Sequence, residues 1–259
     1  MNYSSPVNKL LKLGDCQNFE DCEKYLNLGI TRDHIPELIR LATDHELIYA
    51  KGDSLEVWAP IYAWRILGQL RAEEAIEPLM KLFHEFPYYD CVSDELPIVF
   101  GKIGVKAIPA LKKYLNDTSY NYHAHTRAVY SLERIANGNP SVRNECVSIL
   151  TKKLKFLKSN EPELNGFIIS YLLNLKAVES IKTIRRAYRK KAVDIEIPGR
   201  LEDAEYELGF HENPSERLKK YLLIMFEGTG GKYNKRVRKN DPCPCGSVQK
   251  FEQCCFRKK

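Results

Sequence analysis

Apolar residues recur every three or four positions along most of this 259-residue chain. The segments that carry this pattern are bounded by Gly, Pro, Asn or Asp. Such spacing predicts consecutive amphipathic helices, because it places apolar side chains on one helix face, and it leaves almost no strand signal. We therefore expect an all-α fold, with helices over residues 7–12, 19–28, 32–43, 55–70, 73–83, 92–103, 106–115, 122–136, 141–157, 161–175, 178–191, 201–207 and 214–226.

The starts of several predicted helices repeat. Residues 34–38, 75–79 and 107–111 are HIPEL, AIEPL and AIPAL, and weaker versions follow at 147–150 and 181–184. Their apolar anchors are 41, 32, 39 and 34 residues apart and are Ile35, Ile76, Ile108, Val147 and Ile181. This is the period of a helical repeat, whose two-helix units must stack to bury their apolar faces. An α-solenoid is the predicted architecture, and an irregular helical bundle or a tetratricopeptide-type array is the alternative.

The repeated segments resemble HEAT repeats, in particular the short HEAT-like repeats of phycobilisome lyases, over roughly residues 30–195. The resemblance implies helix pairs stacked through apolar side chains, and such burial stabilises by roughly 25 cal/mol per Å². The residues expected in the core are Trp58, Trp64, Leu67, Leu79, Leu82, Phe83, Phe100, Leu111, Tyr130, Leu132, Ile149, Leu154 and Leu172.

A glycine-rich stretch separates the predicted helices from a basic tail. Residues 228–231 are GTGG, which a helix does not sustain, so we expect a helical body over residues 1–227, a flexible linker over 228–239 and a tail over 240–259. Residues 232–259 hold nine Lys or Arg and two acids, a net charge of +7 against +6 for the whole chain. The tail is therefore expected to attract an anionic partner.

Four of the eight cysteines lie in this tail as C-x-C, eight residues, then C-C. Thiolates at this spacing can converge on one tetrahedral cation, so Cys243, Cys245, Cys254 and Cys255 are predicted zinc ligands. Disulfides are the alternative, but two bridges in so short a segment would be strained. The remaining cysteines are expected to be small buried apolar side chains and are Cys16, Cys22, Cys91 and Cys146.

The run CPCGSVQKFEQCC, preceded by Asn-Asp-Pro, resembles the SEC-C motif, the zinc-binding tail of the SecA preprotein-translocase motor. The resemblance implies a zinc-bound docking element for a SecB-like chaperone or the ribosome, with Cys255 in the place where the family has Cys or His. This sequence departs from the usual pattern at Val248, Gln249 and Glu252, where the family favours Gly, Lys and Lys. These departures make the tail less basic than the usual motif.

Two basic groups of side chains are candidate contacts for a partner. One lies in and beside the tail, and the other on the predicted helix over residues 178–191, which is interpreted either as a solvated basic face or as a docking surface for rRNA or an acidic protein. The predicted partner-binding residues are Lys235, Arg236, Arg238, Lys239, Lys250, Phe251, Arg257, Arg185, Arg186 and Arg189.

Other polar and aromatic clusters are weaker candidates. His123 and His125 are the candidate residues of an enzyme site, although capping and packing of a turn is the simpler interpretation. His34 and His45 lack the spacing that places two ligands on one helix face. The aromatic segment at residues 86–89 is either a recognition edge or packing between repeats.

The sequence shows no basic-plus-apolar leader and no run of apolar residues long enough to span a bilayer, so a cytoplasmic protein is expected. It also lacks a phosphate-binding Gly-rich loop, a GxSxG elbow and an HExxH helix. The prediction is therefore a zinc-binding adaptor that recognises partners through its solenoid surface and its tail. The alternative is an enzyme or an RNA-binding protein that uses the solenoid groove.

Overall fold

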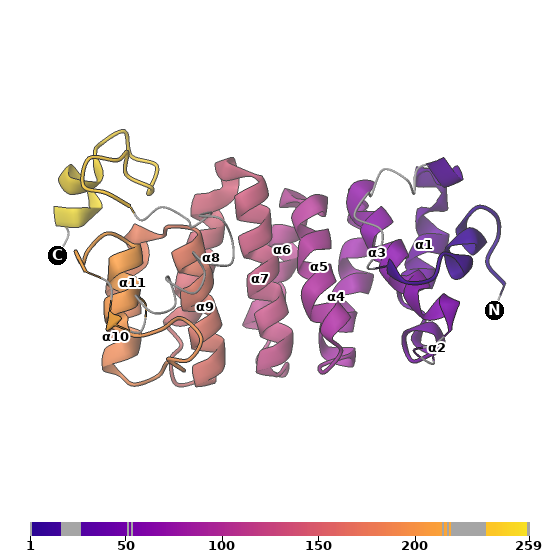
Figure 1. Ribbon diagram of the computed structural model, residues 1–259, viewed down its shortest axis with the longest axis horizontal. Coiled ribbons are helices and arrows are strands. Elements are labelled where there is room, and N and C mark those ends of the chain that lie inside the picture. Colours follow the sequence, from indigo (N-terminus) through magenta and orange to yellow (C-terminus); the bar gives the residue numbers. More distant parts are fainter. Residues whose placement is uncertain are drawn as a thin grey trace. The chain divides into compact units, whose positions relative to one another are not determined.

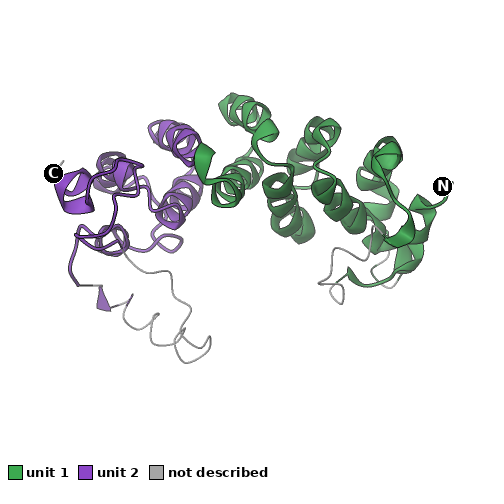
Figure 2. Ribbon diagram, turned by 90° about the horizontal axis from the view of Figure 1, so that it is seen from above, with its two compact units in different colours: residues 1–142 green, residues 143–259 purple. Residues whose placement is uncertain are grey.

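The computed structural model describes residues 2–16, 27–50, 54–213 and 237–257, together with positions 52, 215, 216 and 218. The chain divides into two compact units, residues 1–142 and 143–259 (Figure 2). Every regular element over the described ranges is helical, and one isolated bridge pairs Pro242 with Lys250. The prediction of an all-α fold is confirmed.

The first unit consists of α-helices that are mostly entered through single 3-10 turns (Figure 1). Its elements are η1 (Val7–Lys12), η4 (Arg32–His34), α1 (Ile35–Ala42), α2 (His45–Ile48), η5 (Leu55–Trp58), α3 (Ala59–Gln69), η6 (Glu73–Ala75), α4 (Ile76–Glu85), α5 (Asp90–Ile103), η7 (Val105–Ala107), α6 (Ile108–Asn116), α7 (Tyr122–Gly138) and η8 (Pro140–Val142). The sequence pattern missed α2, because a four-residue helix is too short to show a period.

Four of the repeated anchors of the sequence lie at such 3-10 entries, namely Ile35, Ile76, Ile108 and Ile181. Val147 does not, because the helix that contains it already begins at Arg143. In the repeats anchored by Ile35, Ile76 and Ile108, the 3-10 turn ends immediately before the isoleucine and the α-helix begins on it. Pro36 and Pro109 lie in the first turn of α1 and α6, where a missing backbone N–H leaves no intrahelical bond unmade. The sequence repeat is therefore a repeat of helix-entry geometry.

The first helices of successive pairs lie side by side: α3 packs on α5, and α5 packs on α7 (Figure 1). Glycines allow this close approach. A Cβ on Gly101 of α5 would lie 2.9 Å from Cβ of Arg134 on α7, whereas a Cβ on Gly68 of α3 would make ordinary contacts at 3.4 Å with α5. The contact between α5 and α7 therefore requires glycine at position 101.

The second unit contains further α-helices and the cysteine segment. Its described elements are α8 (Arg143–Leu154), α9 (Pro162–Asn174), η9 (Val178–Ser180), α10 (Ile181–Arg189), α11 (Leu201–Glu207), η10 (Phe251–Gln253) and η11 (Cys255–Arg257). Helix α8 packs on α9 and α10, and α10 packs on α11. The turn between α9 and η9 repeats that between α3 and η6, because Lys176 and Arg71 both take a left-handed backbone conformation there, with φ of 50° and 48°.

The predicted core is largely observed. Eleven of the thirteen predicted core residues are buried, while Trp58 and Tyr130 are partly exposed. Trp64 is fully buried, and its indole N–H donates to the Ala42 carbonyl at 2.7 Å, so its polar edge is satisfied inside the apolar interior. The predicted helices over residues 19–28 and 214–226 fall mainly outside the described residues, as does Cys22. The predicted boundaries 1–227, 228–239 and 240–259 stay predictions.

Candidate metal centre

Backbone hydrogen bonds fold the cysteine segment into a tight hairpin. The N–H of Cys243 donates to the Gln249 carbonyl, and the N–H of Phe251 donates to the Asp241 carbonyl, each at 2.9 Å. Gly246 closes the turn after the first cysteine pair, with φ of 84° and its N–H donating to the Cys243 carbonyl at 3.2 Å. The ladder brings the two ends of the segment together, so the two cysteine pairs converge.

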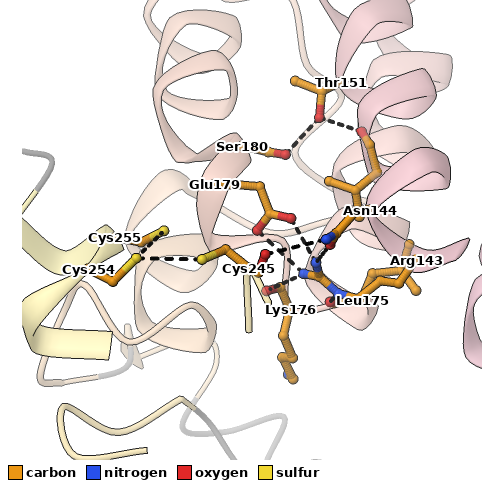
Figure 3. A network of polar contacts seen from close by, with 11 residues as sticks. Arg143, Asn144, Thr151, Leu175, Lys176, Glu179, Ser180, Cys245, Cys254 and Cys255 are labelled. Carbon is orange, nitrogen blue, oxygen red and sulfur yellow. Dashed lines mark hydrogen bonds and ion pairs between the residues drawn. The ribbon is translucent and has the colours of Figure 1, made fainter. Parts of the chain in front are cut away.

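The four Sγ atoms of Cys243, Cys245, Cys254 and Cys255 all lie within 4.8 Å of one another. The Sγ atom of Cys254 is 3.5 Å from that of Cys245 and 3.9 Å from that of Cys255 (Figure 3). In a tetrahedral site with metal–sulfur bonds of about 2.3 Å, neighbouring sulfur atoms are about 3.8 Å apart. The donor set therefore fits one tetrahedral metal ion, and all four side chains are free thiols rather than disulfides.

Hydrogen bonding and burial act differently on the thiols. Burial opposes the ionisation of Cys245, but hydrogen bonds from Ser247 and from the neighbouring thiols of Cys243 and Cys254 outweigh it and lower the pKa of this thiol to about 6. Burial raises the pKa of Cys243 and of Cys255. Since metal binding requires thiolates, a bound cation would provide the charge that stabilises them in these buried positions.

Four protein ligands would complete a tetrahedral coordination sphere. A catalytic zinc site instead keeps one position open for water or substrate. The chemistry of this donor set is therefore structural: a metal ion would link the two cysteine pairs and hold the loop between them, which contains Ser247 and Val248.

The cysteine segment packs on the end of α11 through aromatic rings. Phe251 is fully buried, and its ring centroid lies 5.2 Å from that of Phe210 and 5.6 Å from that of Phe256. Gly209 lies beneath this cluster with φ of 78°, and a Cβ there would be only 2.2 Å from the Val237 carbonyl oxygen. The absence of a side chain at position 209 thus permits the segment to approach the helix end.

A second contact joins the cysteine segment to the start of α8 (Figure 3). The side-chain amide of Asn144 points at the Cys245 carbonyl at a long 3.5 Å, and a Cβ on Gly246 would lie 3.2 Å from the same amide nitrogen. The neighbouring Arg143 donates to Glu179 at 2.7 Å and to the Leu175 carbonyl at 2.9 Å. Asn144, which contacts the cysteine segment, therefore follows directly on an arginine that is held by its ion pair with Glu179.

The predicted partner-binding residues of the tail have different environments. Lys250 is exposed, Lys239 is 3.4 Å from Glu212, and Arg238 is 3.3 Å from Asp241. Phe251 differs from the prediction, because its ring is buried in the aromatic cluster and so packs the segment instead of facing a partner. Lys235 and Arg236 lie outside the described residues, as does the side chain of Arg257.

On α10, the three predicted arginines also differ. Arg186 and Arg189 are exposed, as the interpretation of a basic face requires. Arg185 instead pairs with Glu205 at 2.6 Å, and its guanidinium lies 5.4 Å from the centroid of the Phe210 ring. Arg185 therefore links α10 to α11 and to the ring that receives the cysteine segment.

The histidines flagged by the sequence make local contacts. His125 is buried and its Nε2 lies 2.9 Å from the Asp117 carbonyl oxygen, while His123 packs edge-on against the exposed Tyr88 ring. His34 accepts from the Thr31 N–H, and His45 pairs with Glu85 at 3.1 Å. Among the residues that the structure describes, the four tail cysteines are the group whose donor atoms could hold a metal ion.

Comparison with known families agrees with this geometry. Residues 240–257 match the SEC-C motif. Residues 61–85, which cover most of the pair α3 and α4, match the PBS lyase HEAT-like repeat. No curated protein and no solved structure matches the chain. The SEC-C resemblance is confirmed, and so is the HEAT-like resemblance for the repeat at residues 61–85. The predicted extent of the HEAT-like repeats over residues 30–195 stays a prediction.

Several residues that position the cysteines were not predicted. Ser247 donates to the Cys254 sulfur at 3.1 Å, and its place two residues after Cys245 is a local signal that could have been used. Asn144 and Phe210 carry no such signal, because Asn144 is 101 positions from the residue it approaches. No helix within the described ranges is long and apolar enough to cross a membrane.

Proposed function

We propose that this protein is an adaptor that binds an acidic protein partner through a zinc-stabilised SEC-C motif carried on a HEAT-like helical body. The observation that supports it is the convergence of four thiols within 4.8 Å in the segment that matches this motif. A closed site of this kind fixes the shape of a loop and does not activate water, which favours recognition over catalysis.

Zinc is the proposed metal. Tetrahedral four-sulfur sites in proteins hold zinc or iron, and the resemblance to the SEC-C motif favours zinc. Each bound zinc would also contribute folding free energy, on the order of 10 kcal/mol in small zinc domains, because the unfolded segment has no preformed site. We expect the hairpin at residues 241–254 to lose its structure when the metal is removed.

The proposed partner is acidic because the exposed charge beside the motif is basic. Zinc bound by four thiolates would lower the net charge of +7 on residues 232–259 by two, which still leaves an excess of positive charge. By resemblance, a SecB-like chaperone or the ribosome is the partner to test first. Binding of this kind is expected to weaken as salt is raised, since exposed charges are screened.

The experiment compares the purified full chain with its Cys243→Ser, Cys245→Ser form. Metal content is measured by mass spectrometry, and binding to purified ribosomes and to a SecB-type chaperone is measured by surface plasmon resonance. We expect one equivalent of zinc and salt-sensitive binding for the full chain, with both lost together in the double variant. Iron in place of zinc would contradict the metal assignment.

Two controls separate the motif from general effects. Cys91→Ser changes a half-buried thiol in the first unit and should leave zinc content and binding unchanged. Lys250→Glu reverses an exposed charge in the motif and should weaken binding while zinc content is retained. Binding that persists in the zinc-free double variant would contradict the proposed role of the motif.

A further inference from the structure

One face of α8 lies beside the cysteine segment. Asn144, Ser148, Thr151, Lys152 and Lys155 are spaced at four, three, one and three residues, which places them along one side of the helix. These residues, with Glu179, Ser180 and Cys245, line a cavity of about 320 Å³. The cavity is therefore a groove along α8, with η9 as a side wall and the start of the cysteine loop at one end. Figure 3 labels Asn144, Thr151, Glu179, Ser180 and Cys245 of this lining.

The groove carries a positive charge that no described residue neutralises. Lys152 and Lys155 are exposed, and within the described part of the chain their ammonium groups have no ion pair or hydrogen bond. The acidic side chain in the lining, Glu179, is already paired with Arg143 at 2.7 Å. Two free ammonium groups therefore face the groove beside a carboxylate that already has a cationic partner.

The hydroxyl of Thr151 offers an acceptor in the groove. The Thr151 hydroxyl donates to the Val147 carbonyl at 2.7 Å, so its only proton is engaged. The contact of 2.7 Å between the Thr151 and Ser180 hydroxyls must therefore be donated by Ser180. Ser180 is buried, whereas Thr151 is half-buried. With its proton engaged, the Thr151 oxygen is the one that can accept a further hydrogen bond, such as that from a backbone N–H group of a bound chain.

We propose that this groove binds an acidic segment of a protein partner, with α8 as the floor and the metal-bound cysteine loop as the end wall. The proposal rests on the proposed function and adds a second surface to it. From Asn144 to Lys155 the helix rises about 16 Å, at about 1.5 Å per residue. An extended segment of about five residues has the same length.

The charges also give the bound segment an orientation. Four thiolates with one divalent cation carry a net charge of about −2, which repels carboxylates from the Cys245 end. The ammonium groups of Lys152 and Lys155 lie toward the other end of α8. The acidic side chains are therefore placed over these two lysines, and a backbone N–H group of the segment lies over Thr151.

The test uses the zinc-loaded full chain and a fluorescein-labelled decapeptide pool. Three adjacent positions of each peptide are fixed as Glu and the others are random, and a Gly-Ser decapeptide is the neutral probe. Fluorescence anisotropy at low salt should show binding of the acidic pool but not of the neutral probe. Lys152→Glu with Lys155→Glu should weaken binding by about tenfold or more, since two attractive contacts become repulsive.

The matched control is Lys190→Glu with Lys191→Glu, which changes the net charge equally at two exposed positions after α10. It should leave binding within about twofold of the unmodified chain. An equal loss in both double variants, or no difference between the acidic and neutral probes, overturns the proposal. Tighter binding of single-stranded poly(U) that depends on Lys152 and Lys155 also overturns it and assigns the groove to nucleic acid.

Measuring the zinc content distinguishes a failure of this groove proposal from a failure of the proposed function. The lysine variants keep all four cysteines, so they should retain one equivalent of zinc. Suppose that the lysine variants retain zinc and still bind the chaperone or the ribosome, while the cysteine double variant does not bind. The groove assignment then fails, and the proposed role of the motif stands. If the unmodified chain binds no zinc, the proposed function itself fails.

Discussion

Gly209 tests whether the cysteine segment is held on the helical body. In Gly209→Ala, the new Cβ would lie 2.2 Å from the Val237 carbonyl oxygen and 3.0 Å from the Phe251 ring. A carbon–oxygen contact ordinarily needs about 3.3 Å, so the segment must shift by about 1 Å. The obstructing oxygen belongs to the backbone, so a rotamer change does not relieve the overlap.

The free-energy cost of this overlap is comparable to the free energy that holds the cysteine segment on the helical body. Overpacking of this kind costs about 1–3 kcal/mol. Burying the Phe251 ring contributes about 1.5–3 kcal/mol, and its ring contacts about 0.5–1.5 kcal/mol. We therefore expect the substitution to remove most of the docking energy and to increase the population of undocked segment by about 10- to 100-fold, since 1.4 kcal/mol is a factor of ten.

Gly29→Ala is the matched control. Gly29 also has a positive φ, 86°, but a Cβ there meets nothing within 4 Å. Both substitutions therefore introduce the left-handed backbone penalty of about 1–2 kcal/mol, and only Gly209→Ala adds the steric overlap. The difference between the two variants isolates the docking contact.

The assay is hydrogen–deuterium exchange of the zinc-loaded protein, followed by mass spectrometry of peptides within residues 237–257. Faster exchange of these peptides in Gly209→Ala, with Gly29→Ala unchanged there, is the expected result. Zinc release to a chelator, followed in parallel, reports whether undocking loosens the metal site. Equal exchange in the two variants would refute the packing of Phe251 on Phe210 as the contact that holds the segment.

Two further predictions concern the helical body, and both can be followed by urea unfolding with tryptophan fluorescence. Gly101→Ala should destabilise the first unit by about 1–3 kcal/mol, because its Cβ would be 2.9 Å from Cβ of Arg134. Gly68→Ala should be neutral or stabilise by up to about 1 kcal/mol, because its Cβ would make ordinary contacts. Equal destabilisation by the two substitutions would contradict this prediction. Arg127→Met should cost about 3–5 kcal/mol, because Arg127 is 3% exposed and donates to the carbonyls of Phe83 and Pro87. A loss below 1 kcal/mol would show that those carbonyls find other donors.

The local patterns of the sequence were sufficient for the helices and for the grouping of the four tail cysteines. The apolar period and the Ile-Pro helix entries are properties of neighbouring residues, so most helices were predicted to within a few positions. The four cysteines were predicted for the same reason, since a hairpin of this length needs only its own backbone hydrogen bonds to bring Cys243 near Cys254. Metal-ligand spacing is a short-range property of the chain.

Tertiary structure decided which of the predicted side chains remain available. Arg185 and Phe251 were expected to contact a partner, yet Arg185 pairs with Glu205, and Phe251 is buried against Phe210. The sequence alone does not reveal these contacts, because each joins residues that are far apart in the chain and only packing brings them together.

The groove along α8 likewise combines a feature that the sequence shows with one that only the tertiary structure decides. Its lysines and their helical spacing are visible in the sequence, where they belong to a general basic surface. Their place beside Cys245 depends on the contact of Asn144 with a residue 101 positions away. The sequence by itself thus determined the helices, their repeat and the four-cysteine cluster, all of which arise from short-range spacing. The tertiary structure alone decided what the cysteine loop packs against, because long-range contacts leave no periodic signal.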